Sequence, residues 1–211
     1  MQGKVVEKQA TLVGKAVVSA EMGVGTELWL IWAHIAIEQA QIARAARSTI
    51  ARQVGAGQQP DLNTELHPAL VAIAGAATSL DGFATEVEKT GIPIKTPNVQ
   101  QPTRAHWVWE TLRGGFTVNS KTNSWPRDLK QLFRLRVGGL HPKTVFGQSV
   151  QHPLVPGVSE TRTIYTTEAA DAAVALMRDI YKTCRTTARP AYPALVSRMS
   201  GLDGALKQVA P

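Results

Sequence analysis

The chain has 211 residues, of which 44% are hydrophobic and 18% are charged, a composition typical of a folded globular domain and not of a disordered chain. This length is enough for one well-buried core, so we expect a single domain over residues 1–211. The single cysteine excludes an intrachain disulfide framework and a cysteine-based zinc finger. No uncharged apolar run has the length of about 18 residues that a transmembrane helix needs. The sequence therefore predicts a cytoplasmic protein with no membrane interaction.

The formal net charge of +7 is concentrated in one stretch of the chain. Residues 104–143 hold eight of the 23 basic residues and only two of the 16 acidic residues. A local excess of basic side chains is the electrostatic footprint of a protein that binds phosphate or another polyanion. Basic clusters also occur on solvated faces that bind no ligand, so both interpretations stay open at this point.

Two long helices are predicted in the first half of the chain. Residues 26–54 form the first, with Thr26 as its N-cap and Gly55 beyond its last turn. Its predicted buried face consists of Leu28, Trp32, Ile35, Ile42, Ala46 and Ile50. The second helix begins at Pro68, a residue suited to a first helical position, and stops before Gly91. Its seam is stricter and consists of Leu70, Ile73, Ala77, Leu80, Ala84 and Val87.

The second half of the chain predicts shorter helices. They cover residues 104–114, a segment from Trp125 to the Gly138–Gly139 pair, a segment from Thr167 to about Cys184, and a C-terminal segment carrying Leu195, Met199, Leu202 and Leu206. Residues 141–160 are rich in proline and glycine and predict a long loop; residues 161–166 alternate in the manner of an extended strand. We therefore expect an all-α helical bundle of four to five main helices with a long Pro/Gly-rich loop.

Several classes of enzyme have no support in the sequence. The chain has no GxGxxG motif after a strand, no GxxxxGK[ST] loop and no HExxH motif. Its five histidines show no metal-ligand spacing with carboxylates. Cys184 lies on the apolar face of a predicted helix, where a cysteine is more often a small core residue than a nucleophile. We therefore predict neither a metal nor a cofactor.

One pair of residues has a spacing that can support chemistry. Arg136 and His141 form an R-x4-H pair, and Arg134 stands in an R-x6-H relation to the same histidine. This spacing is common by chance in a chain of this composition, so its context decides its weight. The pair lies inside the basic stretch, at a point where a helix breaks at two glycines, and His141 is followed by proline and the long loop.

The segment LFRLRVGGLHPKTVF…HPLVPG…ETRTIYTTEAADAAVALMRDIY, roughly residues 132–182 and about a quarter of the chain, resembles the HEPN superfamily. Its members are small helical-bundle proteins named for nucleotide binding in higher eukaryotes and prokaryotes. The resemblance rests on an arginine near a helix end that runs into a His-Pro pair, a proline loop and a Thr-capped helix. The residue after the motif arginine is usually polar in active members, whereas this chain has Val137.

The resemblance implies roles for individual residues. His141 would act as the general acid or base on RNA, and Arg136 would stabilise charge on the phosphate. Arg134 would be the substitute or second phosphate contact, and a homodimer would bring two such pairs to one phosphate. The remaining candidate nucleic-acid-binding residues come from the basic stretch and are Arg127, Lys130, Lys143, Arg104 and Trp107.

A structural interpretation of the same residues stays open. His141 would then cap a helix end, and Arg136 would pair with an acid such as Asp128. Trp107, Trp109 and Trp125 would likewise be either base-stacking residues or core residues.

The sequence thus predicts an RNA- or nucleotide-binding protein, with metal-independent endoribonuclease activity of a toxin–antitoxin or phage-defence type and an antitoxin or other protein as a further partner. The alternative is a catalytically inactive relative that binds a nucleic acid or a partner protein.

Overall fold

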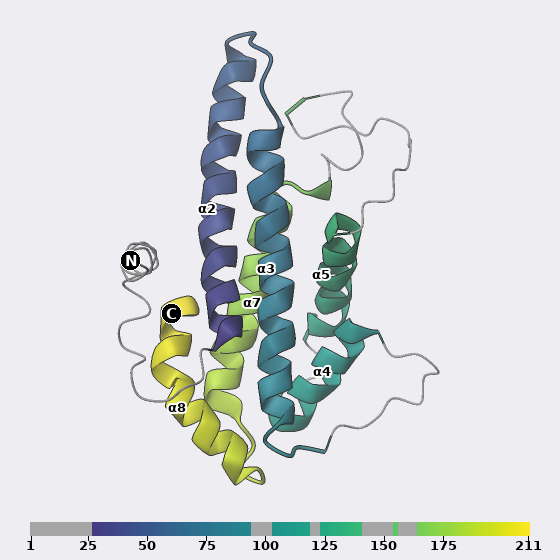
Figure 1. The fold of residues 1–211 in the computed structure, drawn as a ribbon, viewed down its shortest axis with the longest axis vertical. Helices are drawn as coiled ribbons and strands as arrows, with labels where there is room; N and C mark the ends of the chain where they lie inside the picture. The colour runs from purple at the N-terminus through teal and green to yellow at the C-terminus, as the bar shows by residue number, and fades with distance from the viewer. Residues whose placement is uncertain (1–26, 94–102, 119–122, 141–153, 156–163) are drawn as a thin grey trace, which may run out of the picture.

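The computed structural model describes residues 27–93, 103–118, 123–140, 154–155 and 164–211. These residues form six helices and no strand: α2 (Leu28–Gly55), α3 (Asn63–Glu88), α4 (Arg104–Gly115), α5 (Trp125–Leu140), α7 (Thr167–Thr187) and α8 (Pro193–Val209). The long helices α2, α3 and α7 pack side by side, α5 lies beside α3, and α8 crosses the end of the bundle (Figure 1). The predicted all-α bundle is confirmed over the described residues.

Helices α2 and α3 pack through small side chains. The buried residues of α2 are Trp29, Ala33, Ala36, Ala40, Ala43 and Ile50. On α3, a Cβ added at Gly75 would lie 3.3 Å from the Cβ of Ala36 and 3.2 Å from the carbonyl oxygen of Trp32. Because the separation of two packed helices depends on the side chains at their contact, alanine and glycine bring these two backbones close together.

The buried face predicted for α2 is wrong for most of its large side chains. Leu28, Trp32 and Ile42 are 65%, 39% and 44% exposed, whereas Ile50 is buried as predicted. The helical period was correct but the phase was shifted, because the prediction weighted bulky residues and the close contact with α3 selects the neighbouring alanines. The N-cap of α2 is Glu27, without a side-chain hydrogen bond, and the helix runs to Gly55, one residue beyond the predicted end. Thr26 lies outside the described residues.

Helix α3 is the central helix of the bundle, and it contacts α2, α4, α5 and α7. Its seam is confirmed: Ile73, Ala77, Leu80, Ala84 and Val87 are buried, and Leu70 is half-buried. The predicted start is wrong, because α3 begins at Asn63 and includes Pro68 within it. Pro68 has no amide hydrogen to donate to the preceding turn. Helix α3 continues through this position with one backbone hydrogen bond missing.

Helix α3 is also the one described helix that is long and apolar enough to cross a membrane. Its most apolar 18-residue window has a mean hydropathy of 1.2, and 56% of that window is buried inside the bundle. Contacts with four other helices account for the apolar surface of α3, as expected for the core helix of a bundle.

The centre of the core is aromatic. Trp29 of α2, Phe83 of α3 and Tyr181 of α7 have ring centroids 5.1–5.4 Å apart. The hydroxyl of Ser79 donates to the carbonyl oxygen of Trp29 at 2.5 Å, and the Tyr181 hydroxyl lies 2.5 Å from the same Ser79 oxygen. Because Ser79 has one hydroxyl hydrogen, Tyr181 is then the donor of the second bond. Complete burial raises the pKa of Tyr181 well above its ordinary value.

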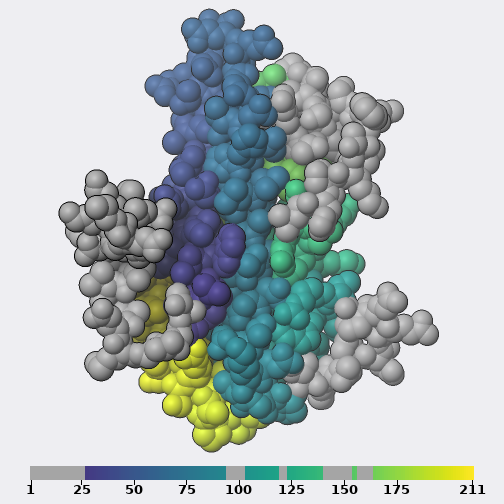
Figure 2. All heavy atoms as spheres, viewed as in Figure 1, coloured from purple at the N-terminus to yellow at the C-terminus, as the bar shows by residue number. Residues whose placement is uncertain are grey.

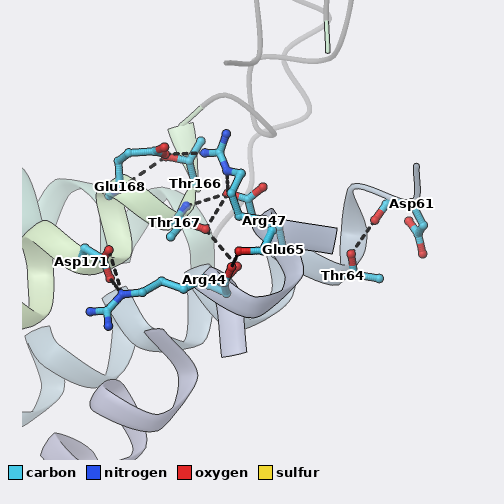
Figure 3. A network of polar contacts seen from close by, with 12 residues as sticks. Arg44, Arg47, Asp61, Thr64, Glu65, Thr166, Thr167, Glu168 and Asp171 are labelled. Atoms are coloured by element: carbon cyan, nitrogen blue, oxygen red, sulfur yellow. Dashed lines mark hydrogen bonds and ion pairs between the residues drawn. The ribbon is translucent and has the colours of Figure 1, made fainter. Parts of the chain in front are cut away.

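A polar network joins one end of the α2–α3–α7 layer (Figure 3). Glu65 of α3 is 2% exposed, and its Oε1 accepts bonds from the Arg47 Nε at 3.0 Å and from the amide of Thr167 at 2.7 Å. Arg47 also pairs with Glu168, and Arg44 pairs with Asp171 through bonds of 2.8 and 3.0 Å. Buried charges need partners of this kind, so the network fixes α7 against the other two helices.

The start of α7 differs from its prediction by one residue. Thr166, and not Thr167, is the N-cap, because its side chain accepts a bond from the amide of Ala169. Thr167 instead uses its amide and hydroxyl on Glu65 and on the Ala43 carbonyl oxygen. The predicted strand at 161–166 is wrong over its described part, because residues 164–166 form no strand. Residues 161–163 lie outside the described residues.

The other helices of the second half agree closely with their predictions. Helix α5 runs through Gly138 and Gly139 to Leu140 instead of ending at the glycines. The α7 residues Val174, Met177, Ile180, Tyr181 and Cys184 are buried, as are the α8 residues Leu195, Met199, Leu202 and Leu206. An isolated antiparallel bridge between Phe116 and Ala188 ties the end of α4 to the end of α7.

Candidate nucleic-acid site

The basic residues of α5 divide into an exposed row and one anchored arginine. Arg127, Lys130 and Arg134 are exposed, and the Arg127 side chain, which is 84% exposed, pairs with its neighbour Asp128 at 3.2 Å. Spacings of three and four residues place all three on one side of the helix. His141 and Lys143 lie outside the described residues, so the expected approach of His141 to Arg136 stays a prediction.

Arg136 is the anchored arginine, and it contacts a residue of another helix. Its Nη1 lies 3.4 Å from the Oδ2 of Asp81 on α3, and its guanidinium carbon lies 5.9 Å from the centre of the Phe133 ring. The structural interpretation of the sequence correctly expected an acid beside Arg136, but Asp128 was the wrong acid. Asp128 is bound instead by Ser124 and Arg127 of its own segment. The side chain of Arg136 keeps 26% of its surface exposed.

Asp81 accepts a second arginine from α4. The Arg104 Nε donates to the Oδ1 of Asp81, and the Arg104 Nη2 donates to the Thr85 hydroxyl at 3.3 Å. The Arg104 guanidinium carbon lies 3.6 Å from the centre of the Trp107 ring, one helical turn further along α4. We call Asp81, Thr85, Arg104, Trp107 and Arg136 the Asp81 cluster. It ties α3, α4 and α5 together at the surface of the bundle.

The Asp81 cluster carries one positive charge in excess, because two guanidinium groups share a single carboxylate. A guanidinium has five N–H donors. The contacts among described residues use two of those donors on Arg104 and one on Arg136. The remaining donors belong to side chains that are 47% and 26% exposed. Planar guanidinium groups bind phosphate through paired N–H donors, so the cluster has the chemistry of a phosphate site.

Sequence reasoning missed Asp81 and Thr85. It followed the basic residues of one stretch, whereas this site places one carboxylate of another helix between two arginines. A signal was present: Asp81 is the only Asp, Glu, Lys or Arg between Glu65 and Glu86 in a mostly apolar helix. Its spacing of four residues from Thr85 places the two side chains on one face of α3.

The tryptophans of the basic stretch have different roles. Trp109 and Trp125 are 6% and 2% exposed, and their rings meet edge to face at 6.4 Å. The Trp125 Nε1 donates to Asp179 at 2.7 Å. These two residues belong to the core and cannot stack on a base. Trp107 is half-buried and is the one of the three that contacts a surface arginine.

The described residues provide no site for a cysteine nucleophile or for a metal ion. Cys184 is fully buried, and burial raises the pKa of its thiol well above the ordinary value; such a thiol is a poor nucleophile, as the sequence predicted. No group of three His, Cys, Asp or Glu side chains in the described part of the chain is placed to hold a metal ion.

A groove of about 630 Å³ separates α5 from α7. Its lining is mostly apolar, with Trp125, Leu132 and Leu135 on α5 facing Ala172 and Leu176 on α7. We call it the α5–α7 groove. None of the Asp81 cluster residues lines it, so the two features are separate sites that share helix α5.

Comparisons with protein-family models, with curated proteins and with solved structures find no match. The fold and the site define the class of protein as an all-α bundle with a surface site of two arginines on one carboxylate. A more specific function has to be inferred from the residues of this chain.

Proposed function

We propose that this protein is a HEPN-like RNA- or nucleotide-binding protein that acts as a metal-independent endoribonuclease of a toxin–antitoxin or phage-defence type in the cytoplasm. One observation carries the proposal: Arg136, the arginine of the R-x4-H pair, shares Asp81 with Arg104 and so lies in a partly exposed site with surplus positive charge. The all-α bundle is the architecture that the resemblance implies. The exposed row of Arg127, Lys130 and Arg134 extends positive charge along the same helix.

The proposed chemistry needs only side chains. Arg136 holds a phosphate of the RNA and stabilises the charge that develops on it during cleavage. His141, the residue directly after α5, takes the proton of the attacking 2′-hydroxyl or gives one to the leaving oxygen, because the pKa of an ordinary histidine makes both forms accessible near neutrality. Arg134 provides a second contact to phosphate.

The proposal includes a homodimer, because one Arg136–His141 pair supplies few groups to a transition state. The apolar lining of the α5–α7 groove supports a protein contact at this side of the molecule. A second copy, or an antitoxin in its place, would cover the groove. Sedimentation at micromolar concentration should give about twice the monomer mass of 22.7 kDa; a monomer with and without RNA contradicts the composite site.

The second candidate function is a catalytically inactive relative that binds nucleic acid or a partner protein. Val137 favours it, because its side chain is 58% exposed. Packing therefore does not require an apolar residue at the position where active members usually carry a polar one. This chain would keep the phosphate site and have lost the ability to cleave.

One experiment separates the two functions. The purified protein is incubated with total RNA in EDTA, and a parallel sample measures RNA binding by electrophoretic mobility shift. Cleavage that persists in EDTA and disappears in His141→Ala supports the ribonuclease. Binding without cleavage supports the inactive relative. The absence of both RNA binding and RNA cleavage overturns the proposed function.

A further inference from the structure

Arg104 and Trp107 form a stacked pair at the surface of the bundle. The guanidinium carbon lies 3.6 Å above the centre of the indole ring, which is the separation of two flat groups in van der Waals contact. Trp107 is half-buried against the core, whereas 47% of the Arg104 side chain is exposed. A flat guanidinium has two faces, and the indole covers one of them. The second face is turned away from the tryptophan, on a side chain that keeps about half of its surface exposed.

Three contacts hold this guanidinium in place before any ligand binds. Asp81 accepts from its Nε, Thr85 accepts from its Nη2, and Trp107 supports its plane. A long arginine side chain in solution must lose rotational freedom when it binds a ligand. Here the fold has already restricted it, so a ligand that stacks on Arg104 meets a preorganised surface.

Asp81 sets the distance between this surface and a phosphate site. Its Oδ1 contacts Arg104 and its Oδ2 contacts Arg136, so the two guanidinium groups bind the two oxygens of one carboxylate and are neighbours. The described residues occupy one of the five N–H donors of Arg136, and Arg104 offers a flat cationic face. Bases that are not paired in a duplex stack on aromatic rings and on guanidinium planes.

We propose that the Arg104–Trp107 pair is a base-stacking subsite for single-stranded nucleic acid. The base of one nucleotide lies on the outer face of Arg104, and its phosphate is bound by Arg136, with Asp81 as the residue that positions both. The inference rests on the proposed function, because it assigns the phosphate at Arg136 to RNA, and it adds the requirement that this nucleotide is unpaired. A base inside a duplex already has both faces covered and cannot enter the subsite.

The test uses fluorescence anisotropy with a labelled single-stranded RNA and with the duplex of the same sequence. Arg104→Lys keeps the charge but loses the flat surface. The matched control is Arg52→Lys, which makes the same change on an exposed side chain of α2 that bonds to Thr49 of its own helix and lies outside the proposed binding site. We expect Arg104→Lys to weaken single-strand binding about tenfold or more, as loss of one stacked base does. Arg52→Lys should change it less than about twofold, and duplex binding should change little in either variant.

A second variant and a fold control keep the test decisive. Trp107→Phe retains a ring of smaller area beneath Arg104 and should weaken single-strand binding by less than Arg104→Lys. Both variants are first compared with wild type by circular dichroism and thermal unfolding, because Arg104 also links α3 to α4. Should Arg104→Lys unfold, Trp107→Phe alone decides: a partial weakening of single-strand binding with unchanged duplex binding supports the subsite, and unchanged single-strand binding overturns it.

The outcomes distinguish the subsite from the proposed function. RNA binding that is equally strong in wild type, Arg104→Lys and Arg52→Lys overturns the subsite and leaves the proposed function standing. If no RNA binds, the proposed function fails, and adenosine 5′-monophosphate is compared with ribose 5-phosphate by calorimetry. Tighter binding of the compound with a base, lost in Arg104→Lys, supports the subsite without the RNA function. Equal or absent binding of the two compounds overturns it.

Discussion

Gly82 of α3 lies directly against Trp29 of α2: a Cβ added at Gly82 would stand 2.8 Å from the Cβ of Trp29. The Cβ of Trp29 is fixed to the α2 backbone, so it can move away only if that backbone moves. The ring of Trp29 in turn packs on Phe83 and Tyr181. The centre of the core therefore depends on the absence of a side chain at one position of an apolar helix.

We predict that Gly82→Ala destabilises the protein although alanine favours the helix. Overpacking a core costs about 1–3 kcal/mol, whereas replacing a helical glycine by alanine gains about 1 kcal/mol. The net loss should be about 1 kcal/mol, measured by urea unfolding. Gly204→Ala in α8 is the matched control, because nothing lies within 4 Å of its added Cβ. The control should be more stable than wild type, and a stabilised Gly82→Ala would refute the close contact.

The packing of α2 also shows where sequence reasoning succeeded and where it stopped. The positions of the helices were predictable, because glycine, proline and apolar periodicity mark their ends and their faces. The buried face of α2 was not predictable. Ala36 and Ala40 look like any other alanines in the sequence, and only the structure shows that Gly75 of α3 lies against Ala36. In α3 the large residues Ile73 and Leu80 do face the core, and there the prediction succeeded.

The candidate site was also predictable only in part, because the sequence does not show which helices contact each other. The basic stretch and Arg136 could be recognised locally. The partner of Arg136 could not, because Asp81 is 55 residues away in the sequence and only the crossing of α3 and α5 brings the two together. Arg104 and Trp107 were each candidates, but nothing in the sequence indicated that they form a stacked pair.

A second prediction concerns the buried hydroxyl of Ser79. Ser79→Ala leaves the Tyr181 hydroxyl and the Trp29 carbonyl oxygen without the bonds that they now make. An unsatisfied buried polar group costs about 1–3 kcal/mol, so we expect a loss of that size in the free energy of unfolding. Ser48→Ala is the control, because Ser48 is exposed and its hydroxyl donates to the carbonyl oxygen of Arg44 in its own helix. Equal effects of the two substitutions would contradict the assigned role of Ser79.

A third prediction follows from the raised pKa of Cys184 and of Tyr181. Both groups are neutral in the folded protein, while in the unfolded chain they ionise near their ordinary values of 9.0 and 10.0. Their contribution to stability is therefore complete below pH 9 and is lost as the pH rises beyond it. Each group should add a slope of about 1.4 kcal/mol per pH unit above its unfolded pKa.

Cys184→Ala isolates one of these two contributions. Urea unfolding between pH 7 and pH 10.5 should show the decline of wild type beginning near pH 9, because the pKa of the thiol in the unfolded chain is 9.0. The variant should begin its decline near pH 10, where the pKa of tyrosine applies. Parallel curves for the two proteins would show that the buried thiol is not a source of the alkaline instability.

A fourth prediction concerns the exposed basic row of α5. Reversing the charge of Arg127 and Lys130 together should weaken RNA binding and make the affinity less dependent on salt. A protein that makes fewer phosphate contacts releases fewer counterions when it binds. Arg44 and Arg47 are unsuitable as a comparison pair because their ion pairs join α2 to α3 and α7. Lys182 and Lys207 are exposed on α7 and α8 and provide the matched double reversal. Equal losses from the two pairs would remove the basic row from the binding site.

The last prediction concerns catalysis at the R-x4-H pair. If the protein cleaves RNA, His141→Ala should reduce the cleavage rate by about 10²–10⁴, the usual contribution of a general acid or base. Arg136→Lys should also be strongly impaired, because lysine keeps the charge but loses the planar fork that binds both Asp81 and a phosphate. Arg134→Lys should be milder, because Arg134 is exposed and has no role in the Asp81 cluster.

Asp81→Asn separates positioning from catalysis in the same assay. Asparagine has nearly the shape of aspartate but carries no charge to share between Arg104 and Arg136, so the two guanidinium groups lose their common anchor. We expect a higher KM with a smaller change in kcat than in His141→Ala, because the chemical groups remain while the phosphate site is less ordered. All variants are compared in EDTA after circular dichroism has shown them to be folded. Cleavage that is equal in wild type and His141→Ala would place the activity elsewhere, and a stronger effect of Arg134→Lys than of Arg136→Lys would make Arg134 the motif arginine.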